Sequence, residues 1–337
     1  MEPEKIESSR LNAELMTKHA VLLDLIGNRS FQYIDMPMYG NVGDLLIMQG
    51  TMEFFRKHNL KPRLISSFSP FDPDWIDKDD VVVFQGGGNF GDLYEGPHTL
   101  RERVAATKPG NRIIILPQSI HFSSPEKAAE SAAIFRRHPD LHLCVRDRVS
   151  FEQARAFTDN VYLLPDMAHQ LYPLWRRGYD KNGDALLISR VDDEKIEHGA
   201  LPNVRVKTHT DWPQFVGERE RTIERFRFVL RNMARLGMGR LGQALVAPWW
   251  IRYADLLVDE AIRMFAKHNL IITDRLHGHI LAVLMDMPNL VLDNSYGKNT
   301  RYASVWTERS RLVTVPGQSS AGRKHARDEK RETQPSF

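Results

Sequence analysis

The feature that most constrains the fold of this sequence is the alternation of short apolar runs with longer amphipathic segments. Each run is rich in β-branched or aromatic residues and ends near Gly, Pro, Asn or Asp, which is typical of a buried strand and its turn. The runs of the first half are FQYID (31–35), PRLIS (62–66), VVVFQ (81–85), RIIILP (112–117), LHLCVR (141–146) and VYLLP (161–165). Helices are expected at 10–26, 44–58, 97–107, 125–137 and 147–157. This alternation predicts a parallel sheet with crossover helices.

A second series of the same kind begins after residues 173–183, where the apolar period is lost. Its expected strands are ALLIS (185–189), VRVK (204–207), ALVAP (244–248), LIIT (270–273) and LVLD (290–293), and its helices lie near 213–235, 251–267 and 276–286. We therefore predict an α/β protein of two Rossmann-like domains, 1–176 and 177–315, and a disordered charged tail at 316–337. Ligands bind beyond the carboxyl ends of parallel strands, so the expected site is the central cleft that the domains face.

The charge and the cysteine content limit which kinds of binding partner and which cellular compartment are expected. A net charge of +3 is compatible with a nucleic-acid partner. However, residues 316–337 hold five basic and three acidic side chains, and the other 315 residues hold 41 basic and 40 acidic ones, so the rest of the chain is nearly neutral. No nucleic-acid partner is expected. The single cysteine, Cys144, excludes an intrachain disulfide and a multi-thiolate metal site. Without a secretory signal or an apolar stretch of roughly 18 residues, we expect a cytoplasmic location, with peripheral contact at the inner membrane face left open.

The first expected strand is followed by a glycine-containing loop, YGNVGD (39–44). A tight loop through Asn41 and Gly43 that opens onto a helix can present backbone N–H groups to an anion. The alternative is an ordinary strand-to-helix turn in which Asp44 caps the helix.

A second glycine loop follows the strand VVVFQ. Gly86, Gly87 and Gly88 stand in a row before Asn89. Such a run has a high entropic cost unless something approaches the backbone closely. We expect a ligand-facing loop; tight packing against the neighbouring domain is the alternative.

Arginines follow two further strands. Arg146 and Arg148 flank Asp147, which leaves an internal ion pair with one spare arginine as an even alternative to a site. Arg190 ends the first strand of the second half, where it can hold a carboxylate or phosphate. The acidic residues at 192–194 could instead neutralise it.

The most specific segment is residues 269–302, in which a buried strand runs into a helix. Thr273 or Asp274 can cap this helix, and Arg275 and His277 lie near its N-terminal end. The helix dipole disfavours a cation there, so Arg275 indicates a nearby anion. His277 near that arginine at a strand end is a candidate functional residue.

Metal binding is not expected from these residues. His277 and His279 are two positions apart and face different sides of a helix, which argues against a zinc pair. The D-x-D string at 72–74 lies in a proline-rich loop. Lys298, after the next strand, is a second candidate contact for an anion.

Taken together, these segments resemble the polysaccharide pyruvyl transferase family. The resemblance spans about 30–305 and is carried by YGNVGD (39–44), FQGGGNFGD (84–92), LPQSI (116–120), RDRVS (146–150), R-x-D-x-E (190–194), TDRLHGHILA (273–282) and LDNSYGKN (292–299). It implies an architecture like that of the GT-B glycosyltransferases. The donor-binding and catalytic residues of the family map to Arg190, Arg275, Leu276 and His277.

The resemblance further implies transfer of pyruvate from phosphoenolpyruvate to two hydroxyls of one sugar in an exopolysaccharide or cell-wall glycan. The acceptor is expected to be a lipid-linked oligosaccharide, and no cofactor beyond the co-substrate phosphoenolpyruvate is expected. Arg190, Arg275 and Lys298, with the two glycine loops, could hold the dianionic donor. His277 is the expected general acid/base. A nucleotide-sugar glycosyltransferase of the same architecture and a non-catalytic glycan-binding protein are the alternatives.

Overall fold

The computed structural model describes residues 6–174, 184–191, 204–293 and 297–316, and every pairing between its strands is parallel. The first sheet has the order β2-β1-β3-β5-β6-β7, with β4 paired to β5. Its strands are β1 (Phe31–Ile34), β2 (Leu64–Ser66), β3 (Val81–Phe84), β4 (Gly87–Gly91), β5 (Ile113–His121), β6 (Leu141–Val145) and β7 (Val161–Leu163). Its helices are α3 (Val42–Lys57), α4 (Glu95–Thr107), α5 (Pro125–Phe135) and α6 (Arg148–Ala154). All six strands expected here are present.

The second sheet has the order β12-β11-β10-β8-β9. Its strands are β8 (Ala185–Ile188), β9 (Val206–Thr210), β10 (Leu270–Thr273), β11 (Asn289–Val291) and β12 (Val313–Thr314). The second-half helices are α7 (Trp212–Val216), α8 (Glu220–Arg235), α9 (Gly239–Phe265), α10 (Leu276–Leu284) and α11 (Lys298–Trp306). The predicted α/β class is confirmed. The predicted domain boundary at 176/177 and nearly all of the predicted tail lie outside the described residues.

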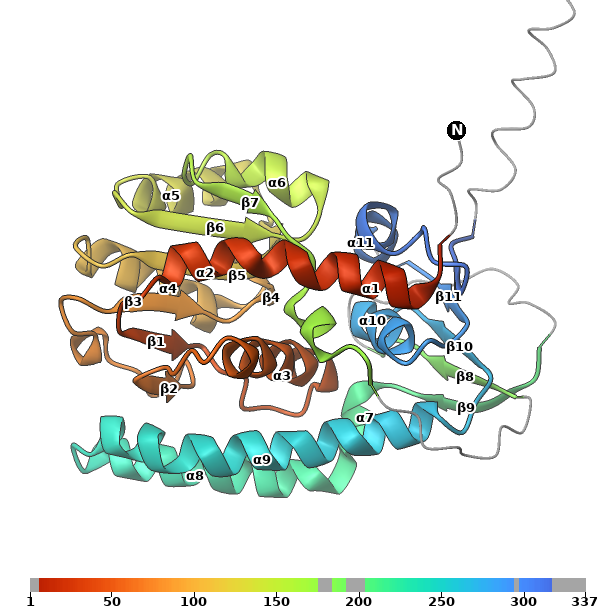
Figure 1. Cartoon of the computed structure of the whole chain (residues 1–337). Coiled ribbons are helices and arrows are strands. Elements are labelled where there is room, and N and C mark those ends of the chain that lie inside the picture. The colour runs from red at the N-terminus through yellow and green to blue at the C-terminus, as the bar shows by residue number, and fades with distance from the viewer. Residues whose placement is uncertain (1–5, 175–183, 192–203, 294–296, 317–337) are drawn as a thin grey trace, which may run out of the picture.

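Helices from each end of the chain pack across the two sheets. The N-terminal helices α1 (Ser8–Thr17) and α2 (Val21–Ile26), joined by a 3₁₀ turn, extend from the first sheet towards α10 (Figure 1). The Asn12 amide of α1 donates to the Val283 carbonyl of α10. In the opposite direction, α9 packs on β2 and α3, beneath the first sheet in Figure 1. The N-terminal helices and α9 of the second half therefore both connect the two sheets.

The predicted strand at 244–248 is wrong, because these residues belong to α9. Val246, Ala247, Trp250 and Ala254 are buried at helical spacing, whereas Leu245 is exposed. Five consecutive apolar residues do not distinguish a strand from a segment of a long helix. The flanking helical period, which continues through Pro248, decides for the helix.

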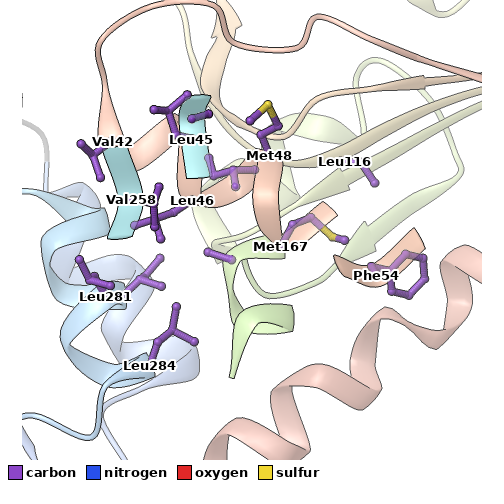
Figure 2. Packing of buried hydrophobic residues seen from close by; sticks show 14 of the residues in the cluster. Val42, Leu45, Leu46, Met48, Phe54, Leu116, Met167, Val258, Leu281 and Leu284 are labelled. Atoms are coloured by element: carbon purple, nitrogen blue, oxygen red, sulfur yellow. The ribbon is translucent and has the colours of Figure 1, made fainter. Parts of the chain in front are cut away.

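Helix α3 forms the centre of the apolar core that joins the two halves. In Figure 2 its Val42 and Leu45 lie opposite Val258 of α9 and Leu281 of α10. All four side chains are buried, and each burial contributes about 1.5–3 kcal/mol. This core fixes the start of α3 against the start of α10, which is where the candidate site lies. Within the described residues, no helix is both long and apolar enough to cross a membrane.

Candidate active site

Side chains that follow strands of both sheets line a cavity of about 410 Å³. From the first sheet, β4 itself and the segments after β1, β2, β4 and β6 contribute, and from the second sheet the segments after β8, β9, β10 and β11 contribute. Nine of the twelve predicted site residues line it: Asn41, Asp44, Gly88, Asn89, Arg190, Arg275, Leu276, His277 and Lys298. The other three, Gly43, Gly86 and Gly87, are not among its lining residues. The structure thus brings together residues far apart in the sequence.

His277 stands in the first turn of α10, at the carboxyl end of β10. The predicted cap of this helix is wrong: Arg275 is the N-cap residue and makes no side-chain cap, while its backbone N–H donates to the Thr273 hydroxyl 2.9 Å away. Gly278 allows this close packing, because a methyl group there would lie 2.5 Å from that hydroxyl oxygen. Thr273 at the end of β10 therefore fixes the first turn of α10 and, with it, the position of His277.

The ring of His277 is held from two sides. Its Nε2 lies 3.2 Å from Oδ2 of Asp166, a fully buried carboxylate at the start of a 3₁₀ turn (Met167–Leu171). On the other side, a methyl group at Gly43 would lie 2.7 Å from Nδ1, so only glycine fits against the ring. Because an ionised carboxylate can only accept, Nε2 carries the proton of this bond and Nδ1 is the acceptor of the neutral ring.

Asp166 is kept ionised by its neighbours. Burial alone would raise its pKa, but His277, Arg146 and the backbone N–H of Ala168 together hold the pKa well below its usual range. The Arg146 guanidinium donates to the same carboxylate at 2.5 Å, and both side chains are buried. Sequence reasoning missed Asp166, although it directly follows the expected strand 161–165, the type of position that drew attention to Arg190.

The alternative reading, an ion pair of Asp147 with one of its two flanking arginines, is not found among the described residues. Asp147 caps α6 by accepting from the Ser150 N–H and hydroxyl. Arg146 instead lines the cavity, donates from Nε to Ser119, and pairs with Asp166. Of the two readings of this arginine, the structure favours a place in the site.

Arg146 and Lys298 converge on Gly88. A methyl group there would lie 2.5 Å from Nζ of Lys298 and 3.2 Å from Nη2 of Arg146. Nη2 is buried and has no hydrogen-bond partner among the described residues. A buried guanidinium N–H without a partner is destabilising unless a ligand accepts from it. Two cations at the backbone of one glycine thus form a candidate anion subsite.

Arg275 does have the nearby anion that its helix position indicates, but the anion belongs to the protein. Its Nε donates to Oδ1 of Asp211 at 2.7 Å, and Nη2 donates to Oδ2. Asp211 is fully buried and caps α7 at the same time. The bidentate pair fixes the guanidinium plane at the cavity wall. Arg190 also lines the cavity, and its backbone N–H donates to Asp274; its neighbours at 192–194 lie outside the described residues.

Comparison with known proteins connects this site to a family. Residues 41–296 match the family model described as polysaccharide pyruvyl transferase, which is more than half of the chain. The chain belongs to the polysaccharide pyruvyl transferase family. It is therefore a transferase, and the family implies a polysaccharide acceptor.

Individual relatives agree with this assignment. "Putative pyruvyl transferase EpsO" of Bacillus subtilis (strain 168) is 37% identical over 313 residues, 90% of this chain and 94% of that protein. "Pyruvyl transferase 1" of Schizosaccharomyces pombe is 30% identical over 241 residues, 67% of this chain and 54% of that protein. A crystal structure of the Klebsiella pneumoniae protein KP1_0663 covers 89% of this chain and 97% of its own, with a TM-score of 0.61 and 18% identity. That likeness shows the fold alone.

The first glycine loop of this pyruvyl transferase departs from the predicted cap. Asn41, not Asp44, caps α3, because its side chain accepts from the Gly43 N–H at 3.0 Å. Asp44 lines the cavity instead. Burial first, and then the Asp44 carboxylate, raise the pKa of the neighbouring Tyr39 well above its usual value. Tyr39 therefore stays a neutral hydrogen-bonding group beside Asp44.

The second glycine segment is largely a strand, not a loop, because Gly87–Gly91 form β4. Gly86 lies against β5, where a methyl group would approach the Pro117 carbonyl oxygen to 2.9 Å. Gly88 and Asn89 nevertheless reach the cavity. Buried Arg101 holds Asn89 by donating to its carbonyl and side-chain oxygens, both at 2.9 Å.

Aromatic side chains of the transferase cavity were not predicted. Tyr39, Phe68, Tyr94 and Trp212 line it beside the cationic groups. They come from four separate segments, so no local sequence motif predicts them. Flat apolar rings beside hydrogen-bonding groups suit the C–H faces of a sugar. Among the described residues, no group of three or more His, Cys, Asp or Glu side chains could hold a metal ion.

Proposed function

We propose that this transferase moves pyruvate from phosphoenolpyruvate to two hydroxyls of one sugar in an exopolysaccharide or cell-wall glycan precursor, forms a cyclic ketal and releases phosphate. The observation that carries the proposal is Nη2 of Arg146, which has no hydrogen-bond partner in the described part of the chain and lies beside Lys298 at Gly88, in the cavity that also contains His277. Phosphoenolpyruvate has a phosphate and a carboxylate, and therefore needs cationic partners at two places.

Two sets of cations could supply those places. Arg146 and Lys298 meet at Gly88, while Arg190 and Arg275 follow β8 and β10 of the second sheet. In our proposal one set takes the phosphate and the other takes the carboxylate. Arg275 is held in place by Asp211 and Arg146 by Asp166, so neither guanidinium needs the ligand to order it.

The proposed reaction adds a sugar hydroxyl across the carbon–carbon double bond of the donor. The methylene carbon gains a proton, and the hydroxyl oxygen bonds to the central carbon after losing its own proton. A second hydroxyl of the same sugar then forms a second C–O bond to that carbon, while the bond from the carbon to the phosphate oxygen breaks. The proton of this hydroxyl leaves with the phosphate. His277 is the proposed general acid/base, because its Nδ1 accepts a proton while Asp166 stabilises the imidazolium through Nε2.

Several finer features belong to the same proposal. The aromatic residues Tyr39, Phe68 and Tyr94 would hold the acceptor, which we propose is a lipid-linked oligosaccharide in the cytoplasm. The two parallel sheets with a cavity lined from both support an arrangement like that of the GT-B glycosyltransferases. We further propose that the reaction uses no metal and no cofactor beyond phosphoenolpyruvate; unchanged turnover after dialysis against a chelator tests this.

Phosphate release from phosphoenolpyruvate in the presence of a glycan acceptor tests the catalytic role. His277→Ala should lower turnover by about 10²–10⁴-fold, the usual contribution of a general acid or base. His58→Ala is the matched control, because His58 is exposed at the far end of α3. Near-normal turnover of His277→Ala would remove this residue from the chemistry. Thermal stabilisation by a UDP- or GDP-sugar, with none by phosphoenolpyruvate, would instead favour a nucleotide-sugar donor.

A further inference from the structure

Exposed apolar side chains concentrate on the hairpin of α8 and α9. Thirteen large hydrophobic residues are exposed in the described part of the chain, and eight of them lie on this hairpin. They are Phe228, Val229, Leu236, Met238, Leu241, Leu245, Trp249 and Leu256. Trp249 is 69% exposed and Leu236 is 72% exposed. Such a concentration on one element marks an interaction surface.

The same hairpin is cationic. Residues 220–265 contain eight arginines and five acidic residues, and the stretch 225–254, which lies between Glu224 and Asp255, contains six arginines and not one Asp or Glu. Five of these arginines, at positions 225, 231, 235, 240 and 252, are exposed. The exposed arginines and the exposed apolar residues together are called the hairpin face below.

The hairpin face is the outer side of both helices. On α9, Leu241, Leu245, Trp249 and Leu256 recur at helical spacing, so they form one stripe. The opposite side of α9 packs on β2 and α3, and the hairpin runs along one margin of the molecule (Figure 1). Nothing in the described fold covers this stripe, since its residues are exposed.

We propose that the hairpin face seats the protein on an anionic lipid surface. Arginines beside Trp, Phe and Leu on a surface helix are the pattern by which helices lie in the headgroup region. The proposal rests on the proposed function, since it explains how a lipid-linked acceptor meets the cavity. Arg227 of α8 lines the cavity, and the next residue, Phe228, is 61% exposed on the hairpin face. Lipid under the face therefore lies close to the cavity.

The charge pattern favours lipid over a second copy of the chain. In a two-fold dimer, this face would meet itself, and the five exposed arginines of each copy would approach the other five. The flanking carboxylates of Glu224, whose Oε2 lies 3.7 Å from Nη2 of Arg231, and of Asp255 leave an excess of positive charge on each copy. Anionic headgroups provide the missing negative charge, and the acyl region accepts the apolar side chains. Each arginine near such a surface strengthens binding about fivefold.

The test is co-sedimentation of the full chain with vesicles of phosphatidylcholine, alone or with about one third phosphatidylglycerol. The wild type should bind the anionic vesicles, and salt should weaken this binding. The triple variant Arg225→Gln/Arg235→Gln/Arg240→Gln should bind about a hundredfold more weakly. Trp249→Gln, which keeps all the charges, should also weaken binding.

A matched control removes three exposed arginines from elsewhere, as Arg29→Gln/Arg137→Gln/Arg148→Gln, and should bind as the wild type does. Turnover with phosphoenolpyruvate and a water-soluble acceptor should be unchanged in the hairpin variants, so the membrane proposal and the proposed function can fail separately.

Three results would overturn the lipid assignment. The first is a wild type that binds neither kind of vesicle. The second is equal binding by the hairpin variants, which would place the contact elsewhere in the chain. The third is a wild-type dimer that Trp249→Gln converts to a monomer without any vesicle binding, which would assign the face to a second copy.

Discussion

Replacing Asp166 by Asn tests whether this buried carboxylate positions His277 for catalysis. The substitution preserves size but removes the charge that both Arg146 and His277 contact. Arg146 is 1% exposed, so its guanidinium would remain buried without a counter-charge. Breaking a buried ion pair from one side destabilises a protein by about 3–5 kcal/mol. For a chain of this size, we expect the melting temperature to fall by roughly 4–7 °C.

Catalysis should suffer beyond this loss of stability. The Asn amide can offer its NH₂ group to Nε2 and reverse the tautomer, and it cannot stabilise an imidazolium. We expect turnover per folded molecule to fall about a hundredfold, within the range of general acid–base effects. Phosphate release from phosphoenolpyruvate, measured well below the melting temperature, gives this number.

A second buried ion pair provides the control. Nη2 of Arg101 lies 2.5 Å from Oδ2 of Asp35, and neither residue lines the cavity. Burial raises the pKa of Asp35 to about 6 despite Arg101, so assays at about pH 8 keep it ionised. Since Arg101 also holds Asn89 at the cavity, Asp35→Asn should lower the melting temperature and lower turnover of the folded enzyme by far less than the hundredfold expected of Asp166→Asn.

A double-mutant cycle decides whether Asp166 acts through His277. If it does, Asp166→Asn/His277→Ala should turn over no more slowly than His277→Ala alone, because the two losses share one step. Losses that multiply would refute the positioning role. Wild-type turnover in folded Asp166→Asn would refute it as well.

Two further predictions concern donor binding and pH. Gly88→Ala places a methyl group 2.5 Å from Nζ of Lys298, so the KM for phosphoenolpyruvate should rise about tenfold at an unchanged melting temperature. Gly110→Ala is the control, because a methyl group at Gly110 would meet no atom within 4 Å. An unchanged KM of Gly88→Ala would contradict the anion subsite. Burial lowers the pKa of both His19 and His279 to about 4 from a usual 6.5, so the unfolded chain takes up their protons first as the pH falls. Stability should therefore drop between pH 6.5 and 4, by about 2 kcal/mol per histidine at pH 5; a melting temperature that does not fall from pH 7 to 5 would contradict this.

Local patterns in the sequence predicted the elements that carry the site. The strands before Arg190 and His277 are continuous apolar runs with turn residues after them, and the rule that parallel sheets bind ligands beyond strand ends selected these residues. The error at 244–248 arose because an apolar run has no period of its own. The helical period of the residues on both sides identifies the segment as part of α9.

Pairing between distant residues could not be predicted in the same way. Arg146 and Asp166 are 20 positions apart, and Arg275 and Asp211 are 64 apart. Nothing local relates these partners, and a nearer acidic residue, Asp147, competed for Arg146. The aromatic residues of the cavity were hidden for the same reason, because each is an isolated ring in a different segment.

These distant pairs also explain how a nearly neutral protein can offer a cationic cavity. Asp166 and Asp211 are fully buried behind the wall, so they hold Arg146 and Arg275 in position while facing away from solvent. A buried carboxylate removes most of the charge of its arginine, and the cavity then depends on donors left over, such as Nη2 of Arg146, and on Lys298. Under the proposed function, selectivity for a small dianionic donor would therefore follow from the placement of N–H groups more than from total charge. Replacing Lys298 by an uncharged residue should accordingly weaken donor binding more than raising the salt concentration does.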